Sequence, residues 1–319
     1  MALSEPHILV LRALGLGDFL TAVPALRAVR RARPGHRLVL AAPAVLAPLV
    51  RLSGTADAVL DQHGLAGPAW PGPSPELAVN LHGRGPQSHL LLRGLGPRRV
   101  VAFDCPAAGH VGPPWHDDEH EVRRWCRLVS ESLGVDADPG DLGLAVPPGP
   151  SGPSEADGAV VVHPGAAFGS RRWPPERFAE VARGVAADGL PVVVTGGPGE
   201  EELAAGVASR AGLPPGRVVA GSLSLEGLAA LVARARLLVC GDTGVAHLAT
   251  AYRTPSVLLF GPTSPARWGP VTDGPHTVLW HGDGHGDPWA DTCDPALLEI
   301  GVPEVRAAVR RRLDATVRA

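Results

Sequence analysis

The chain has 319 residues, of which 45% are apolar, and its 29 basic and 32 acidic side chains give a formal net charge of −3. This length is typical of two domains, each large enough to bury a core. The near-neutral charge argues against a nucleic-acid-binding protein, because such domains are usually strongly basic.

Short apolar runs alternate with helical patterns through the first half of the chain. Strands are predicted at His7–Arg12, Arg37–Ala41, Ala56–Leu60, Leu77–Leu81 and Arg99–Phe103. Helices are predicted at Thr21–Ala32, Pro43–Leu52, Gln87–Leu92 and Glu119–Leu133. Strands that alternate with helices indicate a parallel sheet covered on both faces.

The alternation stops at Ala145–Gly158, which is rich in Pro, Gly and Ser and is the best linker candidate. Further strands are predicted at Ala159–His163, Pro191–Thr195, Leu237–Cys240 and Ser256–Phe260. Further helices are predicted at Pro174–Ala187, Glu200–Ala211, Leu225–Ala233, Val245–Ala251 and Pro303–Val317. We therefore expect two doubly wound α/β domains, residues 1–150 and 151–319, with ligands at the carboxyl ends of their strands.

Other features exclude several classes of protein. No apolar run reaches the length of about 18 residues that a spanning helix needs. The first residues lack the basic region and cleavage site of a signal peptide. The four cysteines have no CxxC spacing, which predicts reduced thiols rather than a disulfide framework or a zinc cluster. These features predict a cytoplasmic protein.

All 29 basic residues are arginine, because the chain contains no lysine. The codon bias of a GC-rich genome is sufficient to explain this composition. The consequence is chemical: any site that normally uses a lysine must use arginine here or do without a cation.

The first predicted strand leads into Gly15-Leu16-Gly17-Asp18. Glycines at this point permit a tight turn and close approach of a ligand, and the next helix presents free N–H groups. The segment is not a dinucleotide fingerprint, because GxGxxG would require a small residue in place of Leu20. Two interpretations of Asp18 remain open, a helix-capping residue and a general base.

Two loops at predicted strand ends in the second half suit a diphosphate. The loop that begins at His163 contains Gly165 and then Arg171 and Arg172, whose guanidinium groups could bind a phosphate in bidentate fashion. The alternative interpretation of this segment is a basic loop exposed to solvent that binds no ligand. The Thr-Gly-Gly loop that ends at Glu200 could offer a carboxylate to ribose hydroxyls, although an acid there also complements a helix dipole.

A third loop, Asp242-Thr243-Gly244, runs from an apolar strand into a helix. Thr243 and Gly244 are expected to direct backbone N–H groups and the positive end of the helix toward an anion. His247 follows one helical turn later, as either a core histidine or a member of the site. The next strand ends in another Gly/Pro turn, Phe260–Pro265.

Four motifs in this order resemble glycosyltransferase family 9, the family of the ADP-heptose:lipopolysaccharide heptosyltransferases. They are the LGxGD start with its TxxPALRAxR helix, the HPG…RxWP loop, the GDTGxxH segment and the LFGPTxPxRxGP segment. The resemblance spans most of the chain. It implies a GT-B fold, with two Rossmann-like domains whose parallel sheets face across a cleft. The acceptor would bind the N-terminal domain, and the nucleotide-sugar would bind the C-terminal domain. Whether the C-terminal helix packs back on the N-terminal domain stays open.

The resemblance also assigns roles. Asp18 matches the family's proposed catalytic base, and Arg171 stands where the family usually has a lysine that contacts the donor phosphates. Arginine keeps the charge but changes the geometry, so the exchange is not conservative. The donor-binding residues implied are Gly17, Gly165, Arg172, Thr195, Gly196, Glu200, Leu223, Asp242, Thr243, Gly244 and His247.

The acceptor side is less clear from the sequence. His82 and Arg84 follow a predicted strand, and Trp115 could stack on a sugar. The alternative is that these are surface or packing residues.

The resemblance implies inverting transfer of a sugar, expected to be heptose, from a nucleoside-diphosphate donor, expected to be ADP-heptose, to a hydroxyl of a glycan or small-molecule acceptor. No metal and no cofactor is expected to be required. No nucleic-acid partner and no transmembrane segment is expected, and peripheral association with a membrane stays open. The alternatives are a sugar-nucleotide epimerase of GT-B architecture, a transferase that uses a UDP, TDP or GDP donor, and a binding protein without catalysis.

Overall fold

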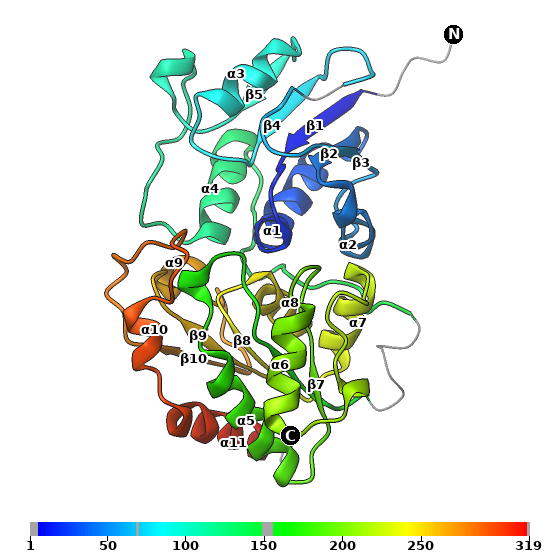
Figure 1. Ribbon diagram of the computed structural model, residues 1–319. Coiled ribbons are helices and arrows are strands. Elements are labelled where there is room, and N and C mark those ends of the chain that lie inside the picture. The colour runs from blue at the N-terminus through cyan, green and yellow to red at the C-terminus, as the bar shows by residue number, and fades with distance from the viewer. Residues whose placement is uncertain (1–5, 68–69, 149–155, 318–319) are drawn as a thin grey trace. The chain divides into compact units, whose positions relative to one another are not determined.

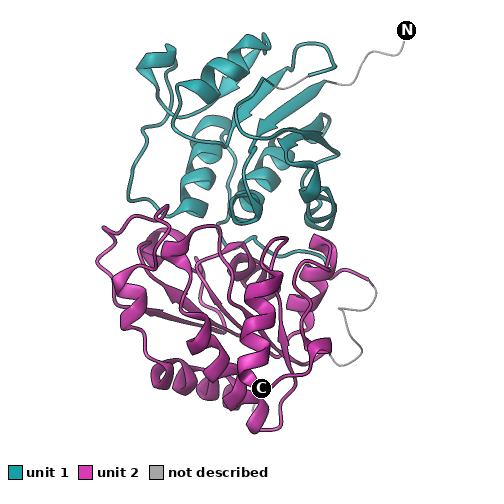
Figure 2. Ribbon diagram, in the orientation of Figure 1, with its two compact units in different colours: residues 1–145 teal, residues 146–319 magenta. Residues whose placement is uncertain are grey.

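The computed structural model describes residues 6–67, 70–148 and 156–317 (Figure 1). By its internal contacts the chain divides into two compact units, residues 1–145 (unit 1) and 146–319 (unit 2), which are coloured separately in Figure 2. Each unit holds one five-stranded sheet in which every neighbouring pair of strands is parallel.

The sheet of unit 1 has the strand order β3-β2-β1-β4-β5. Its strands are β1 (His7–Leu11), β2 (Arg37–Ala42), β3 (Ala58–Asp61), β4 (Leu77–Asn80) and β5 (Arg99–Val101). Its helices are α1 (Leu16–Ala32), α2 (Ala47–Ser53), α3 (Gln87–Gly94) and α4 (Glu121–Leu133), with short 3-10 helices at Ala44–Leu46 and Pro106–Ala108. The central strand β1 is a continuous apolar run because helices cover both faces of such a sheet, and Ile8 to Leu11 are completely buried.

The sheet of unit 2 has the strand order β10-β9-β8-β6-β7. Its strands are β6 (Val160–His163), β7 (Val192–Val194), β8 (Leu237–Gly241), β9 (Ser256–Phe260) and β10 (His276–Trp280). Its helices are α5 (Pro175–Ala187), α6 (Glu201–Ala211), α7 (Leu225–Arg234), α8 (Gly244–Tyr252), α9 (Pro265–Trp268), α10 (Pro295–Glu299) and α11 (Val302–Val317), with 3-10 helices at Gly169–Arg171 and Pro215–Arg217.

The C-terminal helix α11 packs on unit 2, against α5 and strands β8, β9 and β10. Its buried residues Val305, Ala308 and Val309 join the apolar core that contains Trp173. The indole Nε1 of Trp173 donates a hydrogen bond of 3.0 Å to the carbonyl of Ile300, just before this helix. The sequence left open whether this helix packs back on the N-terminal domain, and the contacts described here tie it to unit 2.

The strand order of each sheet reverses direction at one point. In unit 1 the chain moves outward from β1 to β2 and β3, and then returns to place β4 on the other side of β1. In unit 2 the same reversal separates β6 from β8. Ligands of open parallel sheets bind at such switch points, beyond the carboxyl ends of the two strands. This rule singles out the segments after β1, β4, β6 and β8.

Most predicted elements are confirmed, with a few corrections. Helix α1 begins at Leu16, five residues earlier than predicted, so Gly17 and Asp18 lie in its first turn rather than in the preceding loop. The predicted helix over Pro43–Leu52 is divided into a 3-10 helix and α2. Strand β10 was not predicted, because this edge strand is only partly buried and its apolar run, Val278 to Trp280, is short. The short helices α9 and α10 were not predicted either.

Candidate active site

In unit 1 the segment after β1 carries Asp18 into the first turn of α1. Gly15 is the residue that precedes the helix, so Asp18 is not itself the N-cap. Its carboxylate, which is 30% exposed, accepts backbone hydrogen bonds at Gly15 and at its own amide. A side chain at the third helical position that reaches back to the N-cap amide stabilises the helix start. The capping interpretation of Asp18 thus has a structural basis, and it leaves part of the carboxylate accessible.

The environment of Asp18 raises its pKa above the ordinary value of 3.8. The largest cause is burial, which disfavours the ionised form. The Arg12 guanidinium opposes this rise, and the Glu121 carboxylate adds to it. A carboxylate with a raised pKa is a stronger base than an exposed one, and this is a property that proton abstraction requires.

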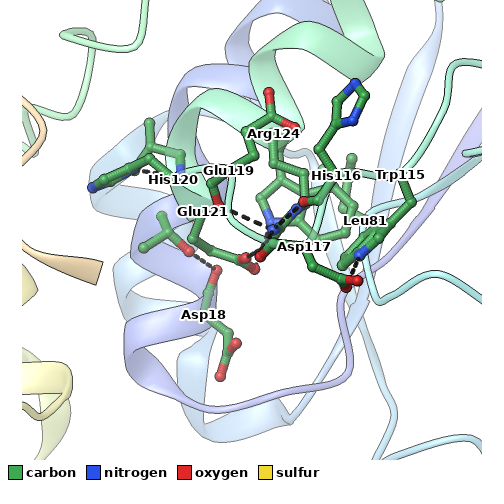
Figure 3. Close-up of polar contacts among 12 residues, drawn as sticks. Asp18, Leu81, Trp115, His116, Asp117, Glu119, His120, Glu121 and Arg124 are labelled. Atoms are coloured by element: carbon green, nitrogen blue, oxygen red, sulfur yellow. Dashed lines mark hydrogen bonds and ion pairs between the residues drawn. The ribbon is translucent and has the colours of Figure 1, made fainter. Parts of the chain in front are cut away.

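Arg12, at the end of β1, is completely buried beside Asp18. Its guanidinium donates to Glu121 Oε1 at 2.9 Å and lies 3.4 Å from Asp18 Oδ1. Glu121, the first residue of α4, also accepts hydrogen bonds from Arg124 and from the indole of Trp125. Figure 3 shows Asp18 and Glu121 close together, with the Asp18 carboxylate pointing away from Glu121.

The residues predicted for the acceptor lie in different environments. His82 follows β4 and is half-buried, and burial together with the nearby charge of Arg12 lowers its pKa to about 4. Its backbone amide donates to Asn80 Oδ1 at 3.0 Å, which fixes the start of this loop. Arg84 is exposed and lies 3.6 Å from Asp117. His82 is therefore neutral at pH 7, so it can accept or donate a hydrogen bond but offers no charge to an acceptor.

Trp115 is held by packing contacts. Its ring meets those of Phe103 and Trp125 edge-on, at centroid distances of 5.1 and 6.0 Å. The Arg124 guanidinium covers it at 4.1 Å, and its Nε1 donates to Asp117 Oδ1 at 2.9 Å (Figure 3). These contacts favour the packing interpretation of Trp115 over stacking on a sugar.

In unit 2 Arg171 ends the short 3-10 helix after β6. It is partly buried, its guanidinium lies 5.3 Å from the ring centroid of Phe168, and its Nε has no hydrogen-bond partner among the described residues. The backbone of this turn approaches Gly241, where an added Cβ would lie only 2.8 Å from the Arg171 carbonyl oxygen. Glycine at the end of β8 therefore allows the Arg171 turn to lie close to the next loop.

Asp242, which follows β8, is 6% exposed. Burial raises its pKa to about 6, while the Arg171 guanidinium and a hydrogen bond with Thr263 lower it. Thr243 is the N-cap of α8 in an extended conformation, and its side chain caps no helix amide. Gly244 is the first residue of that helix. A cation, a carboxylate and a helix N-terminus therefore meet at the β6/β8 switch point, as the sequence predicts.

Glu200 lies over two glycines that follow the neighbouring strands β6 and β7. A Cβ on Gly165, after β6, would overlap its carboxylate, and a Cβ on Gly196, after β7, would lie 3.0 Å from its Cβ. The carboxylate accepts a hydrogen bond of 2.8 Å from the amide of Gly197. The structure thus brings Gly165, Gly196 and Glu200 together, although they come from two loops.

The remaining predicted donor residues flank this arrangement. Arg172 is exposed and donates to the carbonyl of Ala166 at 2.8 Å. Thr195 is buried at the end of β7. His247 lies on α8 with its ring centroid 6.2 Å from that of Trp268. Leu223, just before α7, is partly buried next to Gly227.

Three residues near these sites were missed in the sequence. Arg12 and Glu121 form the ion pair beside Asp18, and Thr263 binds Asp242. The only signal for Arg12 was a charged residue that ends the apolar run HILVL, and nothing linked Glu121 to it across more than a hundred residues.

Among the residues that the structure describes, no three His, Cys, Asp or Glu side chains gather in a way that could hold a metal ion. In the same part of the chain no helix combines the length and the apolar character of a membrane span. The four cysteines, Cys105, Cys126, Cys240 and Cys293, are free thiols in the structure.

A family model described as glycosyltransferase family 9 (heptosyltransferase) matches residues 110–285, more than half of the chain. The lipopolysaccharide heptosyltransferase 3 of Escherichia coli is 32% identical over 159 residues, which are 48% of this chain and 46% of that protein. The chain thus spans about half the length of the curated relatives it matches.

Two solved structures share the fold over nearly the whole chain. The glycosyl transferase family 9 protein of Veillonella parvula superimposes with a TM-score of 0.80 at 23% identity and covers 99% of each chain. The Escherichia coli ADP-heptose lipopolysaccharide heptosyltransferase II gives a TM-score of 0.79 at 20% identity and covers 97% of this chain and 99% of its own. The predicted GT-B architecture of two Rossmann-like units is thereby confirmed. The predicted family is confirmed as well, and the chain belongs to glycosyltransferase family 9.

Proposed function

We propose that the protein is an inverting glycosyltransferase that moves a sugar from a nucleoside-diphosphate donor to a hydroxyl of an acceptor. The observation that carries this proposal is the arrangement of Arg171, Asp242 and the N-terminus of α8 at one switch point. Together they offer a cation and backbone amides to a diphosphate, and a carboxylate to a sugar hydroxyl.

The donor would bind in unit 2. Arg171 and the amides of Thr243 and Gly244 bind the diphosphate and stabilise the charge that it gains as the glycosidic bond breaks. Asp242, held by Thr263, accepts a hydrogen bond from the sugar. Glu200 accepts hydrogen bonds from the ribose, because its carboxylate lies over glycines that let a nucleoside approach.

Asp18 would serve as the base. The acceptor oxygen attacks the anomeric carbon on the face opposite the diphosphate, and Asp18 takes the hydroxyl proton as the new bond forms. The bond between the anomeric carbon and the diphosphate oxygen breaks, and its electron pair leaves with the nucleoside diphosphate. A positioned base contributes typically about 10²–10⁴-fold to such a step.

ADP-heptose is the proposed donor. Support comes from the family description and from the similar Escherichia coli protein that is described as an ADP-heptose lipopolysaccharide heptosyltransferase. The acceptor is proposed to be a glycan or a small molecule with a free hydroxyl. A cytoplasmic location and catalysis without a metal cofactor remain predictions of the sequence.

The test is release of nucleoside diphosphate from ADP-heptose in the presence and absence of a heptose-deficient lipopolysaccharide acceptor, with UDP-, TDP- and GDP-sugars in parallel. The proposal requires ADP release that depends on the acceptor and survives EDTA. Activity lost in EDTA and restored by Mg²⁺ would contradict the metal-independent part. Preference for a UDP or TDP sugar would contradict the donor, and epimerisation of a nucleotide-sugar without any acceptor would favour the epimerase alternative instead.

A further inference from the structure

The guanidinium of Arg12 makes an unusual number of contacts for one buried side chain. Its Nε donates to the backbone carbonyl of Asp18 at 2.9 Å, and its Nη1 donates to the carbonyl of Leu81 at 2.5 Å. Its Nη2 lies within reach of Asp18 Oδ1, Thr21 Oγ1 and Glu121 Oε1, at 3.4, 3.2 and 2.9 Å. One side chain thus connects the turn that carries Asp18 with the loop after β4 and with the start of α4.

Glu121 is itself fully engaged. It is 6% exposed, and besides Arg12 it accepts hydrogen bonds from Arg124 and from Trp125 Nε1, the latter at 2.8 Å. The two arginines lower the pKa of Glu121 although burial raises it, so this carboxylate is ionised in the folded protein. The indole of Trp125 also lies 4.8 Å beneath the Arg12 guanidinium.

The cluster of Arg12, Arg124 and Glu121 is electrically neutral only when the Asp18 carboxylate is ionised. Arg12 and Arg124 bring two positive charges, and Glu121 brings one negative charge. The ionised Asp18 carboxylate supplies the second negative charge, and protonated Asp18 would leave one buried cation uncompensated. Uncompensated buried charge is costly, so the cluster favours the ionised form of Asp18 against the opposite effect of burial.

We propose that Arg12 is the positioning residue of Asp18: it fixes the helix turn that presents the carboxylate and supplies the charge that keeps this carboxylate ionised, while Glu121 limits how much of that charge Asp18 experiences. The role of Arg12 in catalysis rests on the proposed function. Its effect on the titration of Asp18 does not, because that titration can be measured without any sugar transfer.

The charged groups around Asp18 come from two parts of unit 1: Arg12 directly follows β1, and Glu121 begins α4. His82, in the loop after β4, also interacts with Arg12, but its pKa of about 4 leaves it neutral in the neutral range. Opposite charges at these two positions shift the pKa of Asp18 in opposite directions, whereas side chains that acted on Asp18 only through packing would leave that pKa in place.

The experiment measures the titration of Asp18 by carbon NMR of protein labelled at the aspartate carboxyl groups, with Asp18→Asn to assign the signal. Arg12→Gln is expected to raise the midpoint by about one pH unit, because an opposite charge at this range shifts a pKa by about 1–3 units. Glu121→Gln is expected to lower it, because the side chain keeps its shape and loses its negative charge.

Arg27→Gln is the matched control. Arg27 lies on α1 and also binds a carboxylate and backbone carbonyls, namely Asp141, Ser53 and Gly143. Its loss is expected to lower the free energy of unfolding and to leave the Asp18 midpoint in place. Arg12→Lys keeps the charge but loses the planar fork, so its midpoint is expected to stay near wild type while kcat falls.

If Arg12→Gln does not fold, Glu121→Gln and Arg12→Lys decide the question. An unchanged midpoint in folded Arg12→Gln, or shifts of the same sign in Arg12→Gln and Glu121→Gln, would overturn the inference. If the Asp18 midpoint shifts as expected but the wild type transfers no sugar, only the proposed function is overturned. If the wild type transfers sugar but the Asp18 midpoint does not move in the variants, only the role of Arg12 is overturned.

Discussion

Arg171 and Asp242 interact across the carboxyl ends of the neighbouring strands β6 and β8, and the charge of Arg171 opposes the rise that burial causes in the pKa of Asp242. Among the described residues, neither side chain forms an ion pair with any other residue, so Arg171 is the charge that acts on Asp242. A bound diphosphate would compete for Arg171, which couples donor binding to the protonation of Asp242.

The first prediction concerns Arg171→Ala. The substitution removes the cation that we propose binds the diphosphate and that lowers the pKa of Asp242. Nucleoside diphosphate binding is therefore expected to weaken by about 10–100-fold, the equivalent of a charge-assisted hydrogen bond. Titration calorimetry with ADP measures the change. Arg183→Ala, an exposed arginine of α5 whose guanidinium binds the carbonyl of Arg210, is the control and is expected to bind ADP as the wild type does. Equal affinity of Arg171→Ala and the control would contradict the assignment.

The second prediction concerns stability and pH through Asp242. Its folded pKa of about 6 lies above the ordinary 3.8, so between these values the folded state binds more protons than the unfolded state. The contribution of Asp242 to the free energy of unfolding is therefore favourable at low pH and declines as the pH rises toward 6, by about 3 kcal/mol in total. Asp242→Asn removes this decline.

Urea unfolding from pH 4 to 7 tests this expectation. The free energy of unfolding of Asp242→Asn, relative to wild type, should increase with pH across this range. Asp57→Asn is the comparison, because the pKa of Asp57 is lowered by its partner Arg30 and its titration lies below this window. Parallel curves for wild type and Asp242→Asn would show that Asp242 is ionised throughout.

The third prediction concerns the glycine under Glu200. A Cβ on Gly165 would overlap the Glu200 carboxylate, so Gly165→Ala is expected to displace that side chain and weaken ADP binding by about tenfold, one lost hydrogen bond to a charged group. Gly197→Ala is the matched control, since a Cβ there would lie 3.6 Å from the carboxylate, an ordinary contact.

The ribose assignment has its own readout. If Glu200 binds ribose hydroxyls, wild type should prefer ADP to 2′,3′-dideoxy-ADP, and Glu200→Ala should lose most of this preference while binding the dideoxy nucleotide unchanged. An equal loss of affinity for both nucleotides would assign Glu200 to the helix start rather than to the ribose.

The fold was largely predictable because each strand is bounded by Gly or Pro and alternates with a helix of regular apolar spacing. The prediction failed where burial is partial, as in β10, which begins with His276 and Thr277 and has only a short apolar run after them. It also failed at the start of α1, because the glycines indicate a loop there although the helix already begins at Leu16. Local patterns do not report how far a helix extends into a glycine-containing turn.

The grouping of Arg171, Asp242 and Thr243 was predictable because the ends of neighbouring parallel strands meet at one edge of a sheet. The cluster around Arg12 was not, because Glu121 reaches it only through the packing of α4 on α1. Trp115 shows the opposite limit: an aromatic residue near an expected sugar site is covered by Arg124 and two other rings. The sequence alone cannot distinguish an aromatic ring that is free to stack on a sugar from one that is covered by its neighbours, as Trp115 is.

The central claim is that Asp18 removes the acceptor proton during inverting transfer. The most direct measurement compares wild type and Asp18→Asn in acceptor-dependent ADP release from ADP-heptose, with donor affinity measured separately and the anomeric configuration of the product determined by NMR. We predict an inverted product from wild type, and for Asp18→Asn a kcat lower by about 10²–10⁴-fold at unchanged donor affinity. Near-full turnover by folded Asp18→Asn, or a product with the donor's anomeric configuration, would contradict this claim.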